Sequence, residues 1–186
     1  ITKINQNELR KLLKKFKNID CLINSFAISI KSNENIQPYS DFEKTINNNI
    51  ISYFKIVIEI VKKMKINSSI VHITSINSKF AFENNPGYQA SKSALSALTR
   101  SFAKDLSNKK IRVNSIAPSY IKTKMTEKSY KNKEKRSYIA KKSLLKRWGD
   151  PKEISSVALF LCSSGSSFIN GQEILVDGGW SIDGGV

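Results

Sequence analysis

The sequence predicts an α/β protein built on a doubly wound parallel sheet, and two observations support this prediction. Short apolar runs with the length of strands alternate with segments in which apolar residues recur at every third or fourth position. Such regular alternation is typical of a parallel sheet with helices on both faces. With 186 residues, 40% of them hydrophobic, the chain can build one core but not two full-sized domains. We therefore expect residues 1–186 to form a single domain.

The first elements in order are a helix, a strand and a second helix. Helical spacing of apolar residues predicts a helix over Glu8–Phe16, and the apolar run Ile19–Ile23 predicts a strand. Ser40 and Glu43 match the Ser-x-x-Glu capping box, in which side chains satisfy free backbone N–H groups at a helix start. Apolar residues then recur at three- and four-residue steps as far as Met64, so we expect one long amphipathic helix.

The rest of the chain continues the alternation with three strands and two helices. In order, we expect a strand over Ile70–Ile73, a helix over about Tyr88–Leu106, a strand over Ile111–Ile116, a helix to about Leu161 and a strand over Glu173–Val176. The second of these helices has the clearest start signal. Asp150 can cap it, Pro151 fits its first turn, and Glu153 stands at its third position.

The charge of the chain raises the question of a nucleic-acid partner. The sequence holds 31 Lys+Arg against 15 Asp+Glu, a formal net charge of +16. The basic residues are spread along the chain, and no nucleic-acid motif accompanies them. The densest stretch, Lys122–Lys146, has the pattern of a solvated helical face. We therefore expect no nucleic-acid partner.

The apolar segments and the cysteines bear on the cellular compartment of the protein. No apolar run reaches the roughly 18 residues that a membrane span needs, and Ile1–Arg10 has no signal-peptide hydrophobic region. We expect a cytoplasmic protein without a membrane partner. Cys21 and Cys162 each lie inside an apolar run, so we expect buried, reduced thiols rather than a disulfide or a metal site.

Tyr88 and Lys92 form a candidate pair for acid–base chemistry. They stand four residues apart at the predicted start of a helix, which places both side chains on one face. A phenol with a pKa near ~10 is a poor acid or base at neutral pH, but a cation within about 4 to 6 Å favours the phenolate. By itself, the same spacing is also typical of an ordinary surface pair.

Two polar residues elsewhere in the chain can join this pair. Ser75 follows the predicted strand Ile70–Ile73, and ligands of doubly wound sheets lie at the carboxyl ends of the strands. Its hydroxyl can hydrogen-bond a substrate oxygen. Asn49 falls on the apolar stripe of the predicted long helix, so its amide needs buried partners. Taken singly, Ser75 can equally be a loop hydroxyl, and Asn49 an inward-facing member of an asparagine run.

Three further residues are expected to have structural roles. His72 lies within a predicted strand without a cluster of metal-ligating residues, so we expect a histidine with satisfied hydrogen bonds and predict no metal site. Trp148 and Trp180 are expected to be packing aromatics, the first near the rim of the substrate cleft and the second near the C-terminus.

Together these motifs resemble the short-chain dehydrogenase/reductase family. Asn49, Ser75 and the Tyr88-x-x-x-Lys92 motif match the family's catalytic tetrad in order and spacing. Other segments that resemble the family are Pro86–Leu95, Ile111–Pro118, Arg147–Ile154, Gly171–Gln172 and Val176–Trp180. The resemblance covers nearly the whole chain and implies a Rossmann-like sheet.

The resemblance also implies a role for each matched catalytic residue. Tyr88 is expected to donate or accept the proton, while Lys92 lowers its pKa and holds the nicotinamide ribose, so both residues also contact the cofactor. Ser75 is expected to orient the substrate carbonyl, and Asn49 to anchor a proton-relay water. The implied activity is hydride transfer between NAD(P) and a small-molecule carbonyl or alcohol, of the 3-oxoacyl thioester, sugar or polyol type. On the cofactor side, the matching residues are Asn24, Pro118, Ile121 and Thr123.

The sequence departs from the family pattern in two ways. The segment Asn24–Ala27 reads Asn-Ser-Phe-Ala where Asn-Asn-Ala-Gly is usual, so Phe26 is expected to narrow the cofactor channel, and Ser119 replaces a glycine. No glycine precedes Gly87, so the family's first strand and glycine-rich turn have no counterpart here. We expect a fragment of a longer protein, with a truncated or catalytically inactive relative, serving only as a subunit, as the alternative.

The missing turn leads to expectations about binding and assembly. A sheet without its first strand leaves a strand edge unpaired and apolar surface exposed. Residues 1–186 alone are expected to bind no dinucleotide, since the helix N-terminus that holds the pyrophosphate is missing. For the full-length protein, the resemblance implies a homotetramer formed partly by helices at 40–65 and 88–106.

Overall fold

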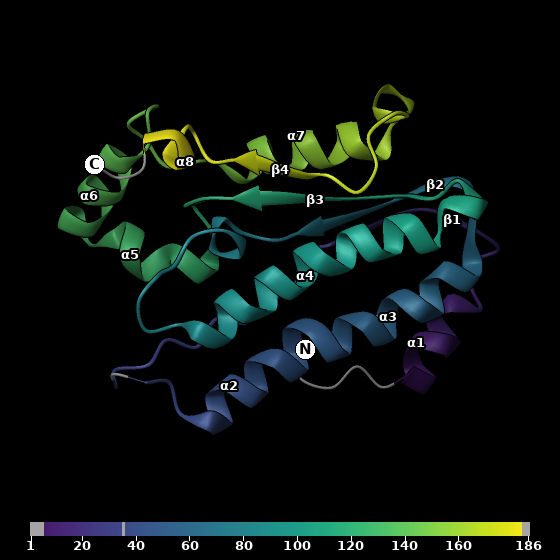
Figure 1. Cartoon of the computed structure of the whole chain (residues 1–186), viewed down its shortest axis with the longest axis horizontal. Coiled ribbons are helices and arrows are strands. Elements are labelled where there is room, and N and C mark those ends of the chain that lie inside the picture. The colour runs from purple at the N-terminus through teal and green to yellow at the C-terminus, as the bar shows by residue number, and fades with distance from the viewer. Residues whose placement is uncertain (1–5, 35, 184–186) are drawn as a thin grey trace.

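The computed structural model describes residues 6–34 and 36–183, and its centre is a four-stranded parallel sheet (Figure 1). The strands are β1 (Ile19–Asn24), β2 (Met64–Ile73), β3 (Arg112–Pro118) and β4 (Glu173–Val176). They lie in the order β1-β2-β3-β4, and each neighbouring pair is parallel. The predicted parallel sheet is thus confirmed, and β4 has the predicted bounds.

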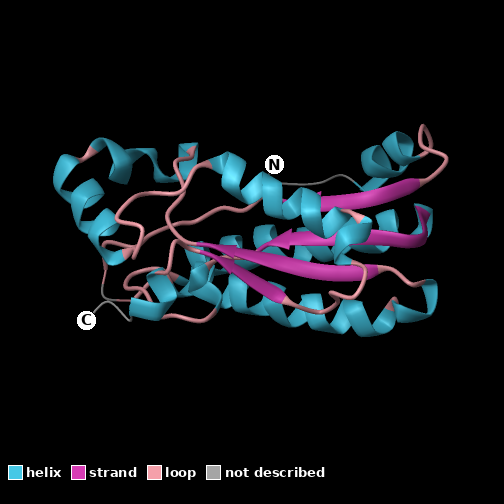
Figure 2. Ribbon diagram, turned by 90° about the horizontal axis from the view of Figure 1, so that it is seen from above, coloured by secondary structure: helices cyan, strands magenta, loops and turns pink. Residues whose placement is uncertain are grey.

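Helices cover both faces of this sheet (Figure 2). They are α1 (Gln6–Leu13), α2 (Tyr39–Ile46), α3 (Ser52–Ile60), α4 (Pro86–Asp105), α5 (Glu127–Lys131), α6 (Lys133–Lys142), α7 (Pro151–Cys162) and α8 (Trp180–Asp183). None of the described helices combines the length and apolar character needed to cross a membrane. The basic stretch that begins at Lys122 forms α5 and α6, whose cations are mostly exposed, as predicted for a solvated face.

Each face of the sheet has its own apolar core. Ile70 packs with residues of α3 and α4, whereas its neighbour Val71 packs with Ala158 and Leu161 of α7. Successive residues of a strand point to opposite faces, so one buried strand supplies both cores. The strand β2 therefore contributes to both cores, and β3 does the same through Val113 and Ile116.

The predicted start of α7 is confirmed. The carboxylate of Asp150 accepts a hydrogen bond from the backbone N–H of Lys152 over 3.0 Å, and Glu153 accepts one from the backbone N–H of Asp150 over 2.8 Å. These reciprocal bonds satisfy N–H groups that have no partner within the helix.

The predicted capping box at Ser40 and Glu43 is wrong. The helix α2 begins at Tyr39, directly after Pro38, and no side chain caps it. Ser40 already lies in the first turn, so its hydroxyl cannot take the capping position. The carboxylate of Glu43 instead accepts a hydrogen bond from the Tyr39 hydroxyl over 3.1 Å.

The expected long helix after Ser40 is divided. A π-helical turn, Asn47–Ile51, separates α2 from α3, and Met64 is the first residue of β2 rather than the end of a helix. A π turn holds one more residue than an α turn at the same place, so it rotates the side chains that follow. The apolar period alone does not reveal this insertion.

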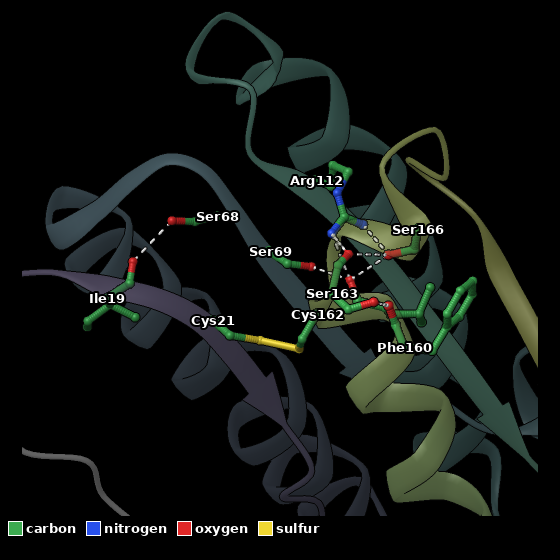
Figure 3. The surroundings of a disulfide bond; sticks show 10 residues. Ile19, Cys21, Ser68, Ser69, Arg112, Phe160, Cys162, Ser163 and Ser166 are labelled. Atoms are coloured by element: carbon green, nitrogen blue, oxygen red, sulfur yellow. Dashed lines mark hydrogen bonds between the residues drawn. A yellow bond between two sulfur atoms is a disulfide. The ribbon is translucent and has the colours of Figure 1, made fainter.

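The prediction of reduced thiols is also wrong, because a disulfide joins Cys21 of β1 to Cys162 at the end of α7 (Figure 3). Ser69 of β2 and Arg112 of β3 donate hydrogen bonds to the Leu161 carbonyl over 2.9 and 3.0 Å. These bonds hold the last turn of α7 against the sheet. As a result, the two cysteines, 141 residues apart, face each other with their Cα atoms at 6.1 Å.

Candidate active site

The candidate site lies at the carboxyl edge of the sheet. Asn24 ends β1, Ser75 follows the end of β2, and Pro118 ends β3. Because all strands are parallel, their carboxyl ends meet at one edge (Figure 1). This edge is the usual ligand-binding edge of doubly wound sheets.

The start of α4 brings two further candidates to this edge. Tyr88 is the third residue of α4, and Lys92 follows one turn later. Gly87 permits this placement, because a Cβ atom there would lie 2.8 Å from Oε1 of Gln37 and 3.3 Å from Cα of Phe42. The absence of a side chain therefore allows α4 to approach α2 closely.

Ser75, Tyr88 and Lys92 lie together. The Ser75 side chain lies close enough to the Tyr88 hydroxyl to favour its phenolate form and so to lower its pKa. Nζ of Lys92 lies 5.4 Å from the centroid of the Tyr88 ring. Asn77 fixes the Ser75 hydroxyl, since Oγ accepts from the Asn77 backbone N–H over 3.2 Å and donates to Oδ1 over 3.0 Å. The structure thus brings together three of the four residues that the sequence predicts to form the catalytic tetrad.

Burial shifts the pKa values of both titratable groups. It raises the pKa of Tyr88 to about 12, and the nearby Ser75 side chain opposes this shift. It lowers the pKa of Lys92 to about 8, because a buried ammonium loses its hydration. The phenol is therefore held in its protonated form, as a proton donor requires. The lowering of this pKa by Lys92 stays a prediction.

Lys92 is anchored from the sheet side. Its side chain is buried, and Nζ donates a hydrogen bond of 2.7 Å to the carbonyl of Ile73 at the end of β2. This bond satisfies one of its three donors and leaves the ammonium beside the tyrosine ring. The orientation of Lys92 is thus set by the strand, not by solvent.

Asn49 occupies the π turn and is buried, and its amide has three partners. Oδ1 accepts from the backbone N–H of Ile28 over 2.9 Å, and Nδ2 donates to the Ile28 carbonyl over 2.9 Å. Nδ2 also donates to Oγ of Ser91 over 3.0 Å, and Ser91 donates to the Tyr88 carbonyl over 2.7 Å. The expectation that this amide finds buried partners is confirmed. Asn49 touches Tyr88 only through Ser91.

Asn24 has the properties of a cofactor contact. The residue is 6% exposed, and its Oδ1 atom is buried without a hydrogen-bond partner among the residues that the structure describes. A buried acceptor of this kind is costly unless a donor satisfies it. A sugar hydroxyl of a dinucleotide at this edge is a suitable donor, so the residue fits such a ligand.

The segment after β3 is held firmly at the same edge. Pro118 is buried at the strand end, and Ile121 is buried and bridges to Gly149, where a Cβ atom would collide with the Ile121 side chain. Thr123 is exposed and opens a short 3₁₀ turn. A cavity of about 230 Å³ adjoins Ile121, but none of the four catalytic candidates lines it.

His72 and Trp148 have the structural roles that the sequence predicts. The ring nitrogens of His72 contact the Tyr53 hydroxyl and, over 2.8 Å, the Thr99 hydroxyl. Burial, assisted by the charge of Lys92, lowers the pKa of His72 to about 3, so the ring is neutral. Trp148 is 3% exposed and donates from Nε1 to the Arg136 carbonyl over 3.0 Å.

Three groups that support the site were not predicted from the sequence. These are the Ser91 hydroxyl, the Asn77 side chain and the backbone of Ile28. Ser91 stands inside the Tyr-Gln-Ala-Ser-Lys motif, so its position gave a signal. The Ile28 backbone gives none, because its pairing with Asn49 depends on the π turn.

Comparison with known proteins identifies relatives of this chain. A family model described as enoyl-(acyl carrier protein) reductase matches residues 5–181. A 3-oxoacyl-(acyl-carrier-protein) reductase of Thermotoga maritima is 34% identical over 176 residues, which cover 94% of this chain and 71% of that protein. A 5-keto-D-gluconate 5-reductase of Escherichia coli is 31% identical over 171 residues, which cover 88% of this chain and 65% of that protein.

A solved structure is also similar to this chain. A 4-hydroxyisoleucine dehydrogenase mutant in complex with NADH and succinate superposes with a TM-score of 0.87 at 32% identity, covering 95% of this chain and 74% of that chain. The fold, the site and these likenesses define an NAD(P)-dependent oxidoreductase with a Rossmann-type sheet. More narrowly, the chain belongs to the short-chain dehydrogenase/reductase family.

Proposed function

We propose that this chain carries the catalytic and substrate-side part of an NAD(P)-dependent enzyme that interconverts a carbonyl compound and an alcohol. One observation carries the proposal. The Ser75 side chain lies close to the Tyr88 hydroxyl, and the Tyr88 ring lies 5.4 Å from the Lys92 ammonium at the carboxyl edge of the sheet. This arrangement provides a proton donor, a hydrogen-bond donor to a carbonyl and a nearby cation.

In the reducing direction, Tyr88 acts as the general acid. When a substrate binds, the Ser75 hydroxyl turns its single proton from Oδ1 of Asn77 to the substrate carbonyl oxygen and holds that oxygen beside the phenol. When bound, the reduced nicotinamide cofactor supplies the hydride that the carbonyl carbon accepts. Tyr88 passes its proton to the oxygen as negative charge develops there, and the product is a neutral alcohol. In the oxidising direction, the phenolate takes the same proton back.

Lys92 and Asn49 support the proton transfer. The cation of Lys92 lowers the cost of phenolate at Tyr88 once the proton has left. Lys92 also has donors free for a ribose hydroxyl of the cofactor, because its bond to Ile73 uses only one. Asn49 fixes the first turns of α4 through Ser91, and we assign it the anchoring of a water that relays the proton.

Four residues are proposed to meet the cofactor besides Tyr88 and Lys92. The buried, unpartnered Oδ1 of Asn24 supports a contact with a sugar hydroxyl. The firmly held segment from Pro118 through Ile121 to Thr123 supports a contact with the nicotinamide carboxamide.

The substrate classes that we propose are 3-oxoacyl thioesters, keto sugar acids and polyols. The names of the Thermotoga and Escherichia relatives support the first two classes. All three classes present a secondary alcohol or its ketone, which the Ser75–Tyr88 pair can bind by the same two hydrogen bonds.

An oligomer is proposed for the full-length protein, with a tetramer as the expected form. Ile51, Phe54 and Ile58 are 44%, 41% and 39% exposed. Their spacing of three and four residues places them on one face of the helix that contains α3. An apolar stripe of this kind favours contact with another subunit.

The alternative of an inactive relative rested on the missing glycine-rich turn and on Phe26 and Ser119, and the two residues both have structural partners. Phe26 packs, half-buried, against the apolar core beneath α3 and α4. The Ser119 hydroxyl donates to the Asp177 carbonyl over 3.1 Å. Since each departure serves the fold, we favour the active enzyme.

The test is a substrate panel with the complete gene product. Oxidation of NADH and of NADPH is followed by absorbance with a 3-oxoacyl thioester, a keto sugar acid and the ketone of a polyol. We expect at least one combination to be turned over, and the Tyr88→Phe protein to be inactive with it. If no combination exceeds the rate of the Tyr88→Phe protein, the proposed function is refuted.

A further inference from the structure

The loop that joins the two reacting hydroxyls carries two aromatic side chains. After Ser75 and the short 3₁₀ turn Ile76–Ser78, residues 79–85 lead to α4 and Tyr88. Phe80 and Phe82 lie within this loop and are half-buried. We call residues 79–85 the catalytic loop. It forms most of the direct covalent connection between Ser75 and Tyr88.

Trp180 packs on both of these aromatics. The centroid of its ring lies 5.3 Å from that of Phe80, edge to face, and 5.5 Å from that of Phe82, in a stacked arrangement. Such pairs contribute about 0.5–1.5 kcal/mol each beyond their area burial. The short helix α8, nearly 100 residues further along the chain, is thereby connected to the catalytic loop.

Hydrogen bonds hold the backbone on each side of the contact between Trp180 and Phe82. The Asp177 carboxylate accepts hydrogen bonds from the backbone N–H groups of Gly179 and Ser181, each over 2.9 Å, so the backbone around Trp180 is held. On the other side, the side chain of Gln89 bonds both the N–H and the carbonyl of Phe82, over 3.1 and 2.5 Å. Gln89 directly follows Tyr88, so the position of Phe82 is linked to that of the proton donor.

We propose that Trp180 is a positioning residue for the reaction, which acts by clamping the catalytic loop through Phe80 and Phe82. The inference rests on the proposed function, because it assigns Trp180 a role in holding Ser75 and Tyr88 in register. Misplacement of reacting groups by about 1 Å can cost around 10²-fold in rate. Loss of the clamp is therefore expected to reduce turnover without removing any reacting atom.

The indole N–H provides a matched control. Nε1 of Trp180 is buried and has no hydrogen-bond partner in the described part of the chain. Trp180→Phe keeps one aromatic ring for the two contacts and removes the N–H together with the fused second ring, whereas Trp180→Ala removes both rings. If the ring contacts are what matters, the phenylalanine variant keeps activity and the alanine variant does not.

The experiment uses the complete gene product and compares wild type with Trp180→Ala, Trp180→Phe, Phe82→Ala and the double variant Trp180→Ala/Phe82→Ala. Trp180→Ala is expected to lower kcat at least tenfold, while Trp180→Phe stays within about threefold of wild type. Because Trp180 acts through Phe82, the two effects should not multiply. The kcat of the double variant should be no more than about twofold below that of the slower single variant. Phe168→Ala is the control for general damage, since Phe168 is fully exposed between α7 and β4.

A second readout does not depend on activity. Lys79 is half-exposed within the catalytic loop and offers a trypsin site there. Limited proteolysis at this site is expected to be at least fivefold faster in Trp180→Ala than in wild type and unchanged in Trp180→Phe. If either turnover or cleavage is unchanged in Trp180→Ala, the clamp is refuted. If wild type itself has no turnover, the proposed function fails, and the cleavage rates alone decide whether Trp180 holds the loop.

Discussion

The side-chain amide of Asn49 donates a hydrogen bond of 3.0 Å to the hydroxyl of Ser91, and this bond connects the π turn to α4. Ser91 passes the connection on to the carbonyl of Tyr88. Asn49 and Ser91 are 42 positions apart, so the bond between them is a tertiary contact within the catalytic site. The proton donor therefore owes its position partly to an asparagine that does not touch its side chain.

Asn49→Leu is expected to destabilise the protein and slow the reaction. The substitution keeps the volume but leaves both backbone groups of Ile28 and the Ser91 hydroxyl without their partner. Each unsatisfied buried group costs about 1–3 kcal/mol, so we expect a loss of at least ~2 kcal/mol in the free energy of unfolding. Urea denaturation measures this loss. Asn47→Leu is the control, because Asn47 is exposed in the same turn, and an equal loss in both variants would contradict the assignment.

The stability of the protein is expected to fall in mild acid because of His72. Its pKa is about 3 in the folded state and near 6.5 unfolded, so between these values the unfolded chain binds a proton that the native state does not. The contribution of the neutral His72 ring to the free energy of unfolding is therefore fully present above about pH 6.5. It is lost progressively as the pH falls toward 3.

This acid sensitivity can be measured cleanly, since His72 is the only histidine in the sequence. Between pH 6.5 and 4.5 the loss should be about 2–3 kcal/mol, at ~1.4 kcal/mol per unit. Denaturant titrations at several pH values give the slope, and His72→Gln should flatten it. A wild-type slope equal to that of His72→Gln would show that the ring is not buried in its neutral form.

Reduction of the Cys21–Cys162 disulfide is expected to lower the melting temperature. The bond closes a loop of about 140 residues, for which the chain-entropy model gives roughly 4–5 kcal/mol. At about 2–4 °C per kcal/mol, the expected drop is ~10 °C or more. Thiol titration of the unfolded protein, with and without reductant, counts the free cysteines. The Cys21→Ser variant should melt like the reduced wild type and be insensitive to reductant; two free thiols in the unreduced protein would disprove the bond.

The sequence predicted most reliably what depends on neighbouring residues. The strand Glu173–Val176 and the cap at Asp150 are confirmed because alternation and capping are local properties. The failed box at Ser40 shows the limit of such signals, since a proline two residues earlier set the helix start.

Contacts between distant segments were harder to predict. The bonds between Asn49 and the Ile28 backbone join residues 21 positions apart, and the disulfide joins cysteines 141 positions apart, beside the bonds of Ser69 and Arg112 to the end of α7. The clamp by Trp180 joins segments nearly 100 residues apart. Each of these features follows from packing of the finished fold, which no window of the sequence contains.

Lys92 is expected to serve both rate and cofactor affinity. In the Lys92→Met variant of the complete gene product, loss of the cation raises the cost of phenolate at Tyr88, and loss of the ammonium removes a donor for the ribose. Both turnover and affinity for the nicotinamide cofactor should fall. Steady-state kinetics with varied cofactor separates the two effects. A variant that loses only one of them would limit Lys92 to a single role.

The most direct test of the central claim is the turnover of Tyr88→Phe in the complete gene product at saturating cofactor. The substitution removes one oxygen atom and little volume, so cofactor binding measured by fluorescence titration should be nearly unchanged. General acid–base catalysis contributes about 10²- to 10⁴-fold, and we expect kcat to fall at least that far. If the variant keeps more than about a tenth of the wild-type kcat, Tyr88 is not the proton donor and the assignment of the site is wrong.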